Sequence, residues 1–364
     1  MGQGPGQARA EVGKMDKPLN ILALSFFPSF LPSSSGGELG LYGLLNALSR
    51  DHNVVLLSSA EVAEAAPVTH RHNLRFKEIR VPKEARFHAI WAKHADAAAH
   101  ADISNVCVAK LGETVTALHE IYLEYYDWAD VIMHDSPYAL TYDLFLGMDS
   151  KVRFYNSQNV EQYFVRSQYP AEAEGGLYDY VDELERKLLR NADVVGACST
   201  EDMTAFEADL RPSAERCIVY RAIDQERVEK EPRSGGPLRV VFGGSKHPPN
   251  TEAAHFIIET LAPQFPDVQF DIFGSCLAAG TYGTNLTAHG FVSDEKRHEL
   301  LLHAHVALNP IRSGSGVNLK ILESAAYGLA IISTAFGLRG TALTASVVSA
   351  GRPRTSRVSG PRTP

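Results

Sequence analysis

LNILALSFFPSFLPSSSGGELGLYGLLNALSRDHNVVLL, residues 19–57, is the stretch of sequence that decides the predicted fold. It opens with a short apolar run, Leu19–Leu24, which is typical of a strand covered on both faces. A loop rich in Pro, Ser and Gly follows to Gly37, and Glu38–Arg50 then places leucines at helical spacing. Asn53–Leu57 is a second apolar run. A strand, a loop, a helix and a strand in this order form a βαβ unit, which predicts a parallel sheet.

The same alternation continues along the chain. We expect further strands over Asp130–Met133, Lys151–Tyr155, Asp193–Ala197, Leu238–Phe242, Val268–Phe273, Val306–Asn309 and Ala330–Ser333. We expect helices over Tyr178–Arg190, from Glu201, and over Glu252–Leu261, Glu295–His303 and Val317–Tyr327. Arg216–Val219 closes the first half of the chain, and Leu286–Phe291 is a short segment with polar flanks. Residues 226–237 are charged and then rich in Pro and Gly, which indicates a linker. The sequence therefore predicts an α/β protein of two doubly wound, Rossmann-like domains, residues 18–225 and 238–344, with a cleft between them.

The composition of the 364 residues is that of an ordinary globular protein, with 45% hydrophobic residues and a net charge of −8. An acidic balance argues against a nucleic-acid partner, because phosphate binding favours a basic one. The four cysteines are far apart, without a Cys-x-x-Cys, so the spacing indicates neither a zinc site nor a disulfide framework. Residues 1–17 form a polar tail with no apolar signal-peptide core. These features predict a cytoplasmic protein with no membrane contact beyond a peripheral one.

The end of the chain has a different composition. No Asp, Glu or Lys follows Glu323, and four arginines after residue 345 give residues 345–364 a local charge of +4. This segment lacks hydrophobic periodicity, so we expect a disordered basic tail. We also expect the C-terminal domain to be incomplete, because the terminus reads as truncated or frame-shifted.

The strongest chemical signal is RSGSGVNLKILE, residues 312–323. Gly314 and Gly316 directly precede a helix, whose free N–H groups and dipole would form an anion site suited to phosphate. Lys320 and Glu323 share one helix face, where the ammonium group can neutralise a diphosphate and the carboxylate can accept hydrogen bonds from a ribose. The alternative is a glycine-rich tight turn followed by a solvated ion pair.

Two weaker candidates follow other strands. Gly36 and Gly37 stand between the first strand and the first helix, where their N–H groups could approach a phosphate from the opposite side of the cleft or simply form a turn. Gly244, Ser245 and Lys246 follow the first strand of the second half, and Lys246 could add a second positive charge or be an ordinary surface lysine.

The acceptor side has four candidates. His134 ends a strand, where its side chain would point into the cleft and meet a sugar hydroxyl; packing or capping is the alternative. Asn156, Asn159 and Glu161 in the next loop are candidates to contact an acceptor. The chain contains no P-loop, no Gly-x-Ser-x-Gly and no His-Glu-x-x-His, and its histidine pairs do not have metal-ligand spacing on a helix, so we expect no metal and no resident cofactor.

Taken together, these motifs resemble the GT-B glycosyltransferases of the retaining group 1 (family 4) type. The matching segments are Gly36-Gly-Glu38, Leu184–Ser199, Phe242-Gly-Gly-Ser245 with Pro249-Asn250, His289-Gly-Phe-Val292 with Asp294, Gly314–Gly328, Ile332-Ser-Thr334 and Gly337-Leu-Arg-Gly340. The resemblance covers residues 19–342 and is most specific over Gly314–Gly340.

The resemblance implies a nucleotide-diphosphate sugar on the second domain and a glycan, lipid or small-molecule acceptor on the first. It implies transfer with retention and without a metal, with Lys320, Lys246 and the glycine amides stabilising the leaving diphosphate. Glu323 would hold the ribose, and Phe291 would flank the base. His134 would lie beside the donor sugar, and the loop residues Ser315, Val317, Asn318 and Leu319 would complete the donor site.

Two departures from the family pattern stand out. The family often pairs two glutamates eight positions apart, and Ser315 takes the first of these positions here. Arg221-Ala222 stands where the family commonly has Asn-Gly. Two alternatives therefore stay open: a catalytically impaired homologue that binds nucleotide, and a sugar-nucleotide epimerase or phosphorylase on the same scaffold.

Overall fold

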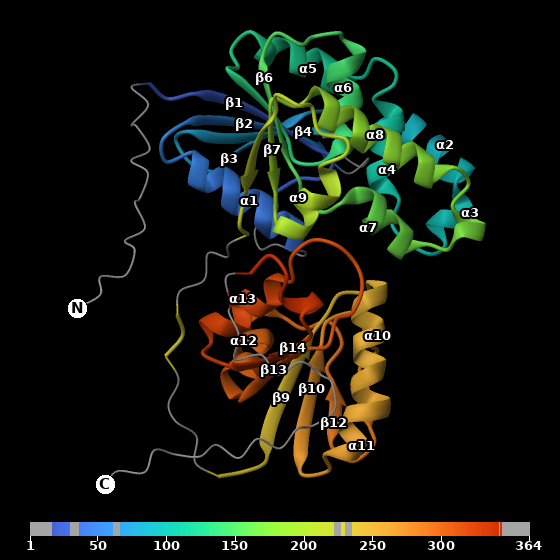
Figure 1. Ribbon diagram of the computed structural model, residues 1–364, viewed down its shortest axis with the longest axis vertical. Helices are drawn as coiled ribbons and strands as arrows, with labels where there is room; N and C mark the ends of the chain where they lie inside the picture. Colours follow the sequence, from blue (N-terminus) through green and yellow to red (C-terminus); the bar gives the residue numbers. More distant parts are fainter. Residues whose placement is uncertain are drawn as a thin grey trace.

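The chain folds into two α/β domains that lie one above the other along the long axis of the molecule (Figure 1). The computed structural model describes residues 17–29, 36–60, 66–221, 227–229, 235–341 and 343. Residues 1–16 of the predicted N-terminal tail 1–17, the whole predicted tail 345–364, and residues 226 and 230–234 of the predicted linker 226–237 lie outside these residues.

The N-terminal domain is built on an eight-stranded sheet in the order β3-β4-β2-β1-β5-β6-β7-β8. All neighbours pair in parallel except β3 and β4, which are antiparallel. The strands are β1 (Asn20–Ser25), β2 (Asn53–Ala60), β3 (Val68–Arg71), β4 (Phe76–Pro82), β5 (Val131–His134), β6 (Val152–Asn156), β7 (Val194–Ala197) and β8 (Glu215–Ile218). The helices are α1 (Gly36–Leu48), α2 (Arg86–Lys93), α3 (Ala95–Ala98), α4 (Ser104–Leu111), α5 (Ala117–Tyr126), α6 (Leu140–Phe145), α7 (Glu161–Gln168), α8 (Leu177–Asn191) and α9 (Thr200–Phe206).

The C-terminal domain has a six-stranded sheet in the order β11-β12-β10-β9-β13-β14, parallel except for β11 with β12. Its strands are β9 (Leu238–Gly243), β10 (Val268–Phe273), β11 (Gly280–Tyr282), β12 (Leu286–Ala288), β13 (Val306–Asn309) and β14 (Ala330–Ser333). Its helices are α10 (Pro248–Phe256), which continues as a π-turn over Ile257–Leu261, α11 (Ala262–Gln264), α12 (Asp294–His303) and α13 (Leu319–Ala326).

Both sheets confirm the predicted doubly wound architecture. The strand order reverses between β1 and β5 in the first sheet and between β9 and β13 in the second. Ligands of open α/β sheets bind in the crevice outside the carboxyl ends of the strands at such a reversal. The loops after β9 and β13 therefore form the place where a ligand of the C-terminal domain would bind.

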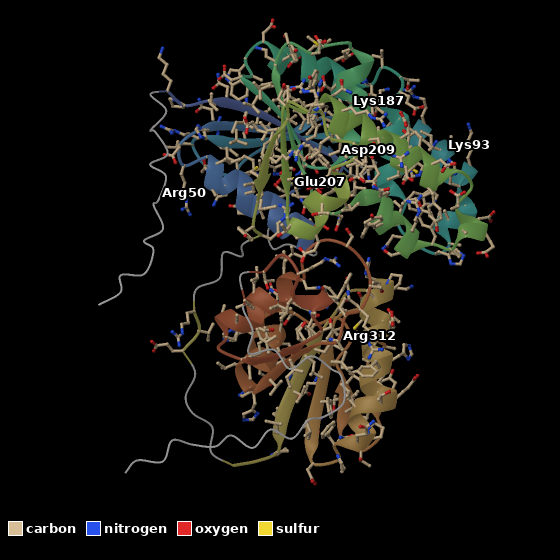
Figure 2. All side chains as sticks on the ribbon, viewed as in Figure 1. Arg50, Lys93, Lys187, Glu207, Asp209 and Arg312 are labelled. Carbon is tan, nitrogen blue, oxygen red and sulfur yellow. The ribbon has the colours of Figure 1, made fainter. Side chains whose placement is uncertain are left out.

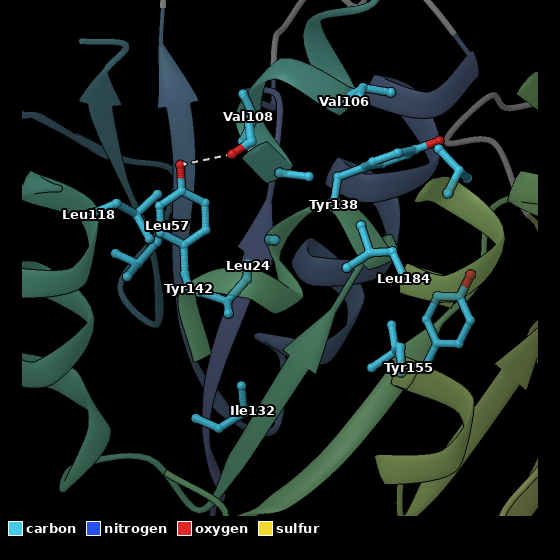
Figure 3. Packing of buried hydrophobic residues seen from close by; sticks show 14 of the residues in the cluster. Leu24, Leu57, Val106, Val108, Leu118, Ile132, Tyr138, Tyr142, Tyr155 and Leu184 are labelled. Atoms are coloured by element: carbon cyan, nitrogen blue, oxygen red, sulfur yellow. Dashed lines mark hydrogen bonds between the residues drawn. The ribbon is translucent and has the colours of Figure 1, made fainter. Parts of the chain in front are cut away.

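Each domain has its own apolar core. The main N-terminal core gathers four fully buried tyrosines, Tyr122, Tyr138, Tyr142 and Tyr155, among aliphatic side chains such as Leu184 (Figure 3). The Tyr142 hydroxyl donates to the carbonyl oxygen of Val108 at 3.4 Å. The C-terminal clusters contain no residue of the N-terminal ones, and Val228 from the predicted linker packs on the C-terminal side. The two domains thus contain separate hydrophobic cores.

The sequence analysis predicts no strand or helix in the long segment between β2 and β5. It forms β3 and β4 at one end of the first sheet and helices α2 to α5, which contribute buried side chains to the main N-terminal core. Among the described residues, no helix is long and apolar enough to cross a membrane.

Candidate functional site

The candidate site lies at the carboxyl end of the second sheet, where the domains meet. The loop after β9 supplies Gly244 to His247, and the loop after β13 leads through Gly314 and Gly316 into α13. These are the two loops at the strand reversal, so the fold brings the two glycine-containing motifs together. This placement is the one expected for a ligand site of a doubly wound sheet.

Lys320 is the central cation of the site. Its Nζ donates to Asn250 Oδ1 at 2.6 Å and lies 4.5 Å from the centre of the Phe242 ring. Among the described residues, no carboxylate forms an ion pair with this ammonium group. Burial without a counter-ion disfavours the charged form, and it lowers the pKa of Lys320 to about 8. A polyanion in the crevice would supply the missing negative charge.

Glu323 follows one turn later on α13 and lines the same hollow as Lys320, together with Gly243 and Phe273. Its Oε1 lies 3.4 Å from Arg297 Nε of α12, and burial raises the pKa of the carboxyl group above its ordinary value. The carboxylate is thus held by one cation while 22% of its side-chain surface stays accessible. Phe291 follows β12 at the same end of the sheet and is 82% exposed, leaving its ring open to stack on a ligand.

The glycine-rich loop is docked against the N-terminal domain. Val160 N–H donates to Ser315 Oγ at 2.9 Å, and the Ser315 hydroxyl lies 3.4 Å from the Val160 carbonyl oxygen. Gly316 has a φ of 71°, and a Cβ at this position would lie 2.4 Å from Asn159 Oδ1 and 2.9 Å from the Gln158 carbonyl oxygen. Only glycine combines this backbone conformation with such a close approach.

Two further residues of the loop, Val317 and Asn318, contact the turn Gly337–Gly340 of the same domain. Asn318 Nδ2 donates to the Gly337 carbonyl oxygen at 3.2 Å, while Val317 lies under Gly340. A Cβ on Gly340 would lie 2.8 Å from the Cys198 carbonyl oxygen, so a second loop of the C-terminal domain also approaches the N-terminal domain closely. Leu319 is the first residue of α13.

The loop after β9 is held mainly by Asn250. Its Nδ2 lies 3.2 Å from both the Ser245 hydroxyl and the Ser245 carbonyl oxygen. Gly244 packs against Asn250 and Cys276, with its carbonyl oxygen accepting from Cys276 N–H at 3.0 Å. Lys246 is exposed, and its ammonium group forms no hydrogen bond or ion pair with the described residues. Lys320, rather than Lys246, is therefore the cation built into this site.

Gly36 and Gly37 lie within the first turn of α1 and not in the loop before it, because the helix begins at Gly36. The same helix packs at Gly40 against other parts of the N-terminal domain, where a Cβ would lie 3.5 Å from Gln158 Oε1 and 3.7 Å from Arg221 Cδ. The residues directly before α1 lie outside the described part of the chain.

His134 requires a correction. We expected its side chain to point into the cleft, but it is fully buried, and its Nε2 lies 3.2 Å from Asp143 Oδ2. Arg153 binds the same carboxylate, with NH2 at 2.6 Å from Asp143 Oδ2. Burial also lowers the pKa of His134. The strand does end at this residue, but its side chain belongs to a buried polar cluster.

Asn156 and Glu161 also require a correction, because neither offers a surface to an acceptor. Asn156 is fully buried, and its Nδ2 donates to Asp135 Oδ1 at 2.8 Å. Glu161 is 3% exposed and accepts from the Tyr138 hydroxyl at 2.8 Å. Asn159 is partly buried and lies between Glu161 and Gly316. These residues support the loop that contacts Ser315.

Two buried carboxyl groups meet at the start of α7. Glu185 Oε1 accepts from Glu161 N–H at 3.0 Å and from the Tyr155 hydroxyl at 2.8 Å. Burial and mutual repulsion raise the pKa of Glu185 to about 8, and burial raises the pKa of Glu161 to about 7. The pair therefore holds at least one proton near neutral pH, and its hydrogen bonds fix the backbone next to Val160.

Several residues at the site were not assigned a role from the sequence. In the sequence Asn250 stands out only as a position that matches the family pattern, yet it binds Lys320. Arg297 holds Glu323, and Arg339 Nε donates to the Gly316 carbonyl oxygen at 2.8 Å. Arg221 NH2 donates to the Ser157 carbonyl oxygen at 2.7 Å, and it is the charged neighbour of the buried Asp135. Only the local motif Gly337–Gly340 had pointed to Arg339.

Metal ligands do not gather in the described part of the chain. No group of three or more His, Cys, Asp or Glu side chains there has an arrangement that could hold a metal ion.

Comparison with known proteins agrees with this geometry. Residues 237–353 match the family described as glycosyl transferases group 1. The match lies in the C-terminal domain and covers less than half of the chain, so this domain is similar to the group 1 glycosyltransferases. No curated protein sequence matches the chain.

Solved structures extend the likeness to the whole GT-B fold. A sucrose-phosphate synthase from Thermosynechococcus elongatus superposes with a TM-score of 0.61 at 15% identity, covering 88% of this chain and 82% of that one. A trehalose-6-phosphate protein from E. coli, bound with UDP-2-fluoro glucose, gives 0.58 at 13% identity, covering 88% and 85%. The catalytic domain of starch synthase IV from Arabidopsis thaliana, bound to ADP and acarbose, gives 0.61 at 12%, covering 89% and 84%.

The family match includes the candidate residues of the C-terminal domain but not those of the N-terminal domain. Lys320, Glu323 and the glycine-rich loop all lie within residues 237–353, whereas His134, Asn156 and Glu161 lie outside them. The glycosyltransferase family match therefore covers the donor-side candidates, while the N-terminal domain is related to the solved structures by fold.

Proposed function

We propose that this glycosyltransferase transfers a sugar from a nucleotide-diphosphate sugar to an acceptor hydroxyl, with retention and without a metal ion. The observation that carries the proposal is Lys320, a cation without a carboxylate partner among the described residues, held by Asn250 at the strand reversal of the C-terminal domain. Two of the similar structures contain UDP-2-fluoro glucose and ADP, which supports a nucleotide in this crevice.

In this proposal, different residues bind the diphosphate, the ribose and the base of the donor. Lys320 and the N–H groups that follow Gly314 and Gly316 bind the diphosphate, where negative charge grows as the leaving group departs. Glu323 accepts hydrogen bonds from the ribose, and the exposed ring of Phe291 stacks on the base. Lys246 is exposed at the rim of the site, where it can add positive charge without being required.

The reaction then needs no basic side chain of its own. The bond between the anomeric carbon and the diphosphate oxygen breaks, and the acceptor oxygen bonds to the same face of that carbon. The hydroxyl proton of the acceptor passes to the departing phosphate oxygen. This route is compatible with the burial of His134, which holds Asp143 and has no contact with solvent.

The test is a panel of UDP-, GDP- and ADP-sugars with an excess of chelator, followed by nucleotide release and by calorimetric titration of the nucleoside diphosphates. We expect one diphosphate to bind and its sugar to turn over with chelator present. Lys320→Met should weaken binding of both the nucleoside diphosphate and inorganic pyrophosphate, whereas Glu323→Ala should weaken only the former. Lys296→Ala is the matched control, since Lys296 pairs with Glu299 on an exposed face of α12. Absence of binding by every diphosphate would refute the proposal.

One alternative is favoured by a specific observation. Both hydrogen bonds of Ser315 go to Val160, and His134 is buried, so neither side chain is available to the donor sugar. A homologue that binds nucleotide sugar without transferring it would have such a site. The same panel separates the two functions, because this alternative predicts binding with no nucleotide release beyond the rate in buffer.

A further inference from the structure

His247 brings side chains of the two domains into direct contact. It stands at the end of the loop after β9 and precedes α10. Its imidazole stacks on the Phe164 ring of α7, with centroids 5.6 Å apart and planes inclined by 15°. Its Nε2 lies 2.6 Å from Gln168 Nε2, at the last residue of the same helix. Figure 1 shows α7 and α10 facing each other across the contact between the domains.

The hydrogen bond with Gln168 defines the state of the ring. An amide nitrogen can only donate, so Nε2 of His247 accepts and the ring proton is at Nδ1. Burial and the positive charge of Lys320 lower the pKa of His247 to about 4, so the ring is neutral at physiological pH. A neutral ring can stack on Phe164 next to the Lys320 cation without adding a second charge.

The backbone of His247 connects this contact to the donor site. Its carbonyl oxygen accepts from Asn250 N–H at 2.9 Å and from Thr251 N–H at 3.0 Å, which starts α10. Asn250 in turn binds Lys320 Nζ at 2.6 Å. On the other side, a Cβ on Gly314 would lie 3.8 Å from His247 Cε1. A shift of the ring would therefore move both loops of the crevice relative to α7.

We propose that His247 is a positioning residue for sugar transfer, which holds the phosphate-binding loops of the C-terminal domain against the acceptor-side domain through Phe164 and Gln168. The inference rests on the proposed function for the reaction that it serves. It assigns His247 no contact with the substrate, since its ring nitrogen and ring face are already used by the N-terminal domain.

Three variants test the role from both sides of the contact: His247→Ala, Phe164→Leu and Gln168→Leu. His255→Ala is the matched control, because His255 lies on the exposed side of α10, where it pairs with Glu259 of the same helical segment. We expect small-angle scattering to show a larger radius of gyration for the three variants than for the wild type and the control. Affinity for the nucleoside diphosphate should stay near that of the wild type, because its binding groups all lie in the C-terminal domain. Turnover should fall by about tenfold to a hundredfold, as expected for reacting groups displaced by about 1 Å.

The double variant Phe164→Leu/His247→Ala should lose no more turnover than His247→Ala alone, because both changes break one contact. The proposal is overturned if the scattering curves coincide, or if diphosphate affinity falls as much as turnover. If the wild-type protein binds no nucleotide sugar, the proposed function fails, while the scattering comparison still decides whether His247 holds the domains together. Gln168 is only partly buried, so the Gln168→Leu variant keeps the test valid if His247→Ala does not fold.

Discussion

At the scale of single residues, the main feature of the candidate site is the buried ammonium group of Lys320. Lys320 has an amide oxygen and an aromatic face as neighbours, but among the described residues no carboxylate pairs with it. Such a lysine is easier to deprotonate than one on the surface, and it gains most from an incoming diphosphate. In the proposed function, the affinity for a diphosphate would therefore depend on the protonation state of Lys320.

This dependence can be measured. The pKa of Lys320 is lowered to about 8, so the free protein loses this charge as the pH rises through 8. A nucleoside diphosphate is already fully ionised above pH 7.5, because its last phosphate pKa is about 6. We expect affinity to fall between pH 7.5 and 9.5 in titration calorimetry. Lys320→Met should bind about tenfold to a hundredfold more weakly at pH 7.5, since a charge-assisted hydrogen bond is lost, and should show a flat pH profile. A flat profile in the wild-type protein would contradict the prediction.

At this scale, the sequence predicts contacts between neighbouring turns of one helix but not contacts between distant segments. Lys320 and Glu323 were correctly placed on one face of a helix because three positions make nearly one turn. Asn250, which holds the lysine, is seventy positions away, and no periodicity connects the two. Polar residues such as Glu161 were expected on the surface, but a tyrosine hydroxyl from another segment satisfies its carboxyl group in the interior.

At the scale of elements, the start of α7 combines two buried carboxyl groups with the loop that contacts Ser315. The pKa values of Glu161 and Glu185 are raised from 4.5 to about 7 and about 8. A carboxyl group with a raised pKa in the folded state stabilises the fold most below its unfolded pKa, and this stability is lost as the pH rises through the folded pKa. Stability should therefore decline as the pH rises from about 4.5 to about 8.

We expect the Tm of the wild-type protein to fall by about 5 °C or more across this range, and that of Glu161→Gln to fall less. Glutamine keeps the oxygen that accepts from Tyr138 but cannot ionise. Glu120→Gln on the exposed side of α5 is the control and should follow the wild type. Equal slopes for Glu161→Gln and the wild type, followed by differential scanning calorimetry, would show that the pair does not govern the pH dependence.

The glycine-rich loop offers a second prediction at this scale. Gly316→Ala introduces a Cβ at φ 71° that would lie 2.4 Å from Asn159 Oδ1. Gly283 has almost the same φ, 68°, with nothing within 4 Å of its added Cβ. Both variants should lose about 1–2 kcal/mol of stability from the backbone conformation. Only Gly316→Ala should also lose turnover of nucleotide sugar, because only this change forces the loop away from the N-terminal domain.

Thermal unfolding and initial rates measure the two effects separately. If Gly316→Ala and Gly283→Ala retained equal turnover, the close approach of the loop to Asn159 would be irrelevant to the reaction.

Elements differed in how well the sequence predicted them. The strands with clear apolar runs, such as β1 and β9, were predicted to within a residue or two, because a strand covered on both faces must be apolar throughout. The segment that forms β3, β4 and α2 to α5 was not assigned. The edge strand β3 is largely exposed, so its sequence carries little apolar pattern, and short helices such as α3 contain too few turns for a periodic signal.

At the scale of the whole molecule, the two domains have separate cores joined by a narrow contact. We expect two calorimetric unfolding transitions, of which a bound nucleoside diphosphate raises only one. At a hundred times its Kd, the ligand should stabilise the C-terminal domain by about 2.7 kcal/mol. Differential scanning calorimetry with and without the ligand measures both transitions. A single transition that moves as a whole would show that the contact between the domains is strong enough to unite their unfolding.

If the N-terminal domain binds the acceptor, as proposed, the contact between the domains has a consequence for how the acceptor can change. Beside the side chains of Asn159, Phe164 and Gln168, the C-terminal loops meet main-chain atoms of the N-terminal domain: the amide of Val160 and the carbonyl oxygens of Gln158 and Cys198. Main-chain atoms are the same whatever side chain is attached. Acceptor-facing side chains can therefore diverge while the joint between the domains stays intact. Chimaeras that combine this donor domain with N-terminal domains of related proteins should retain the joint, provided that the loop preserves its backbone path and that α7 keeps partners for His247.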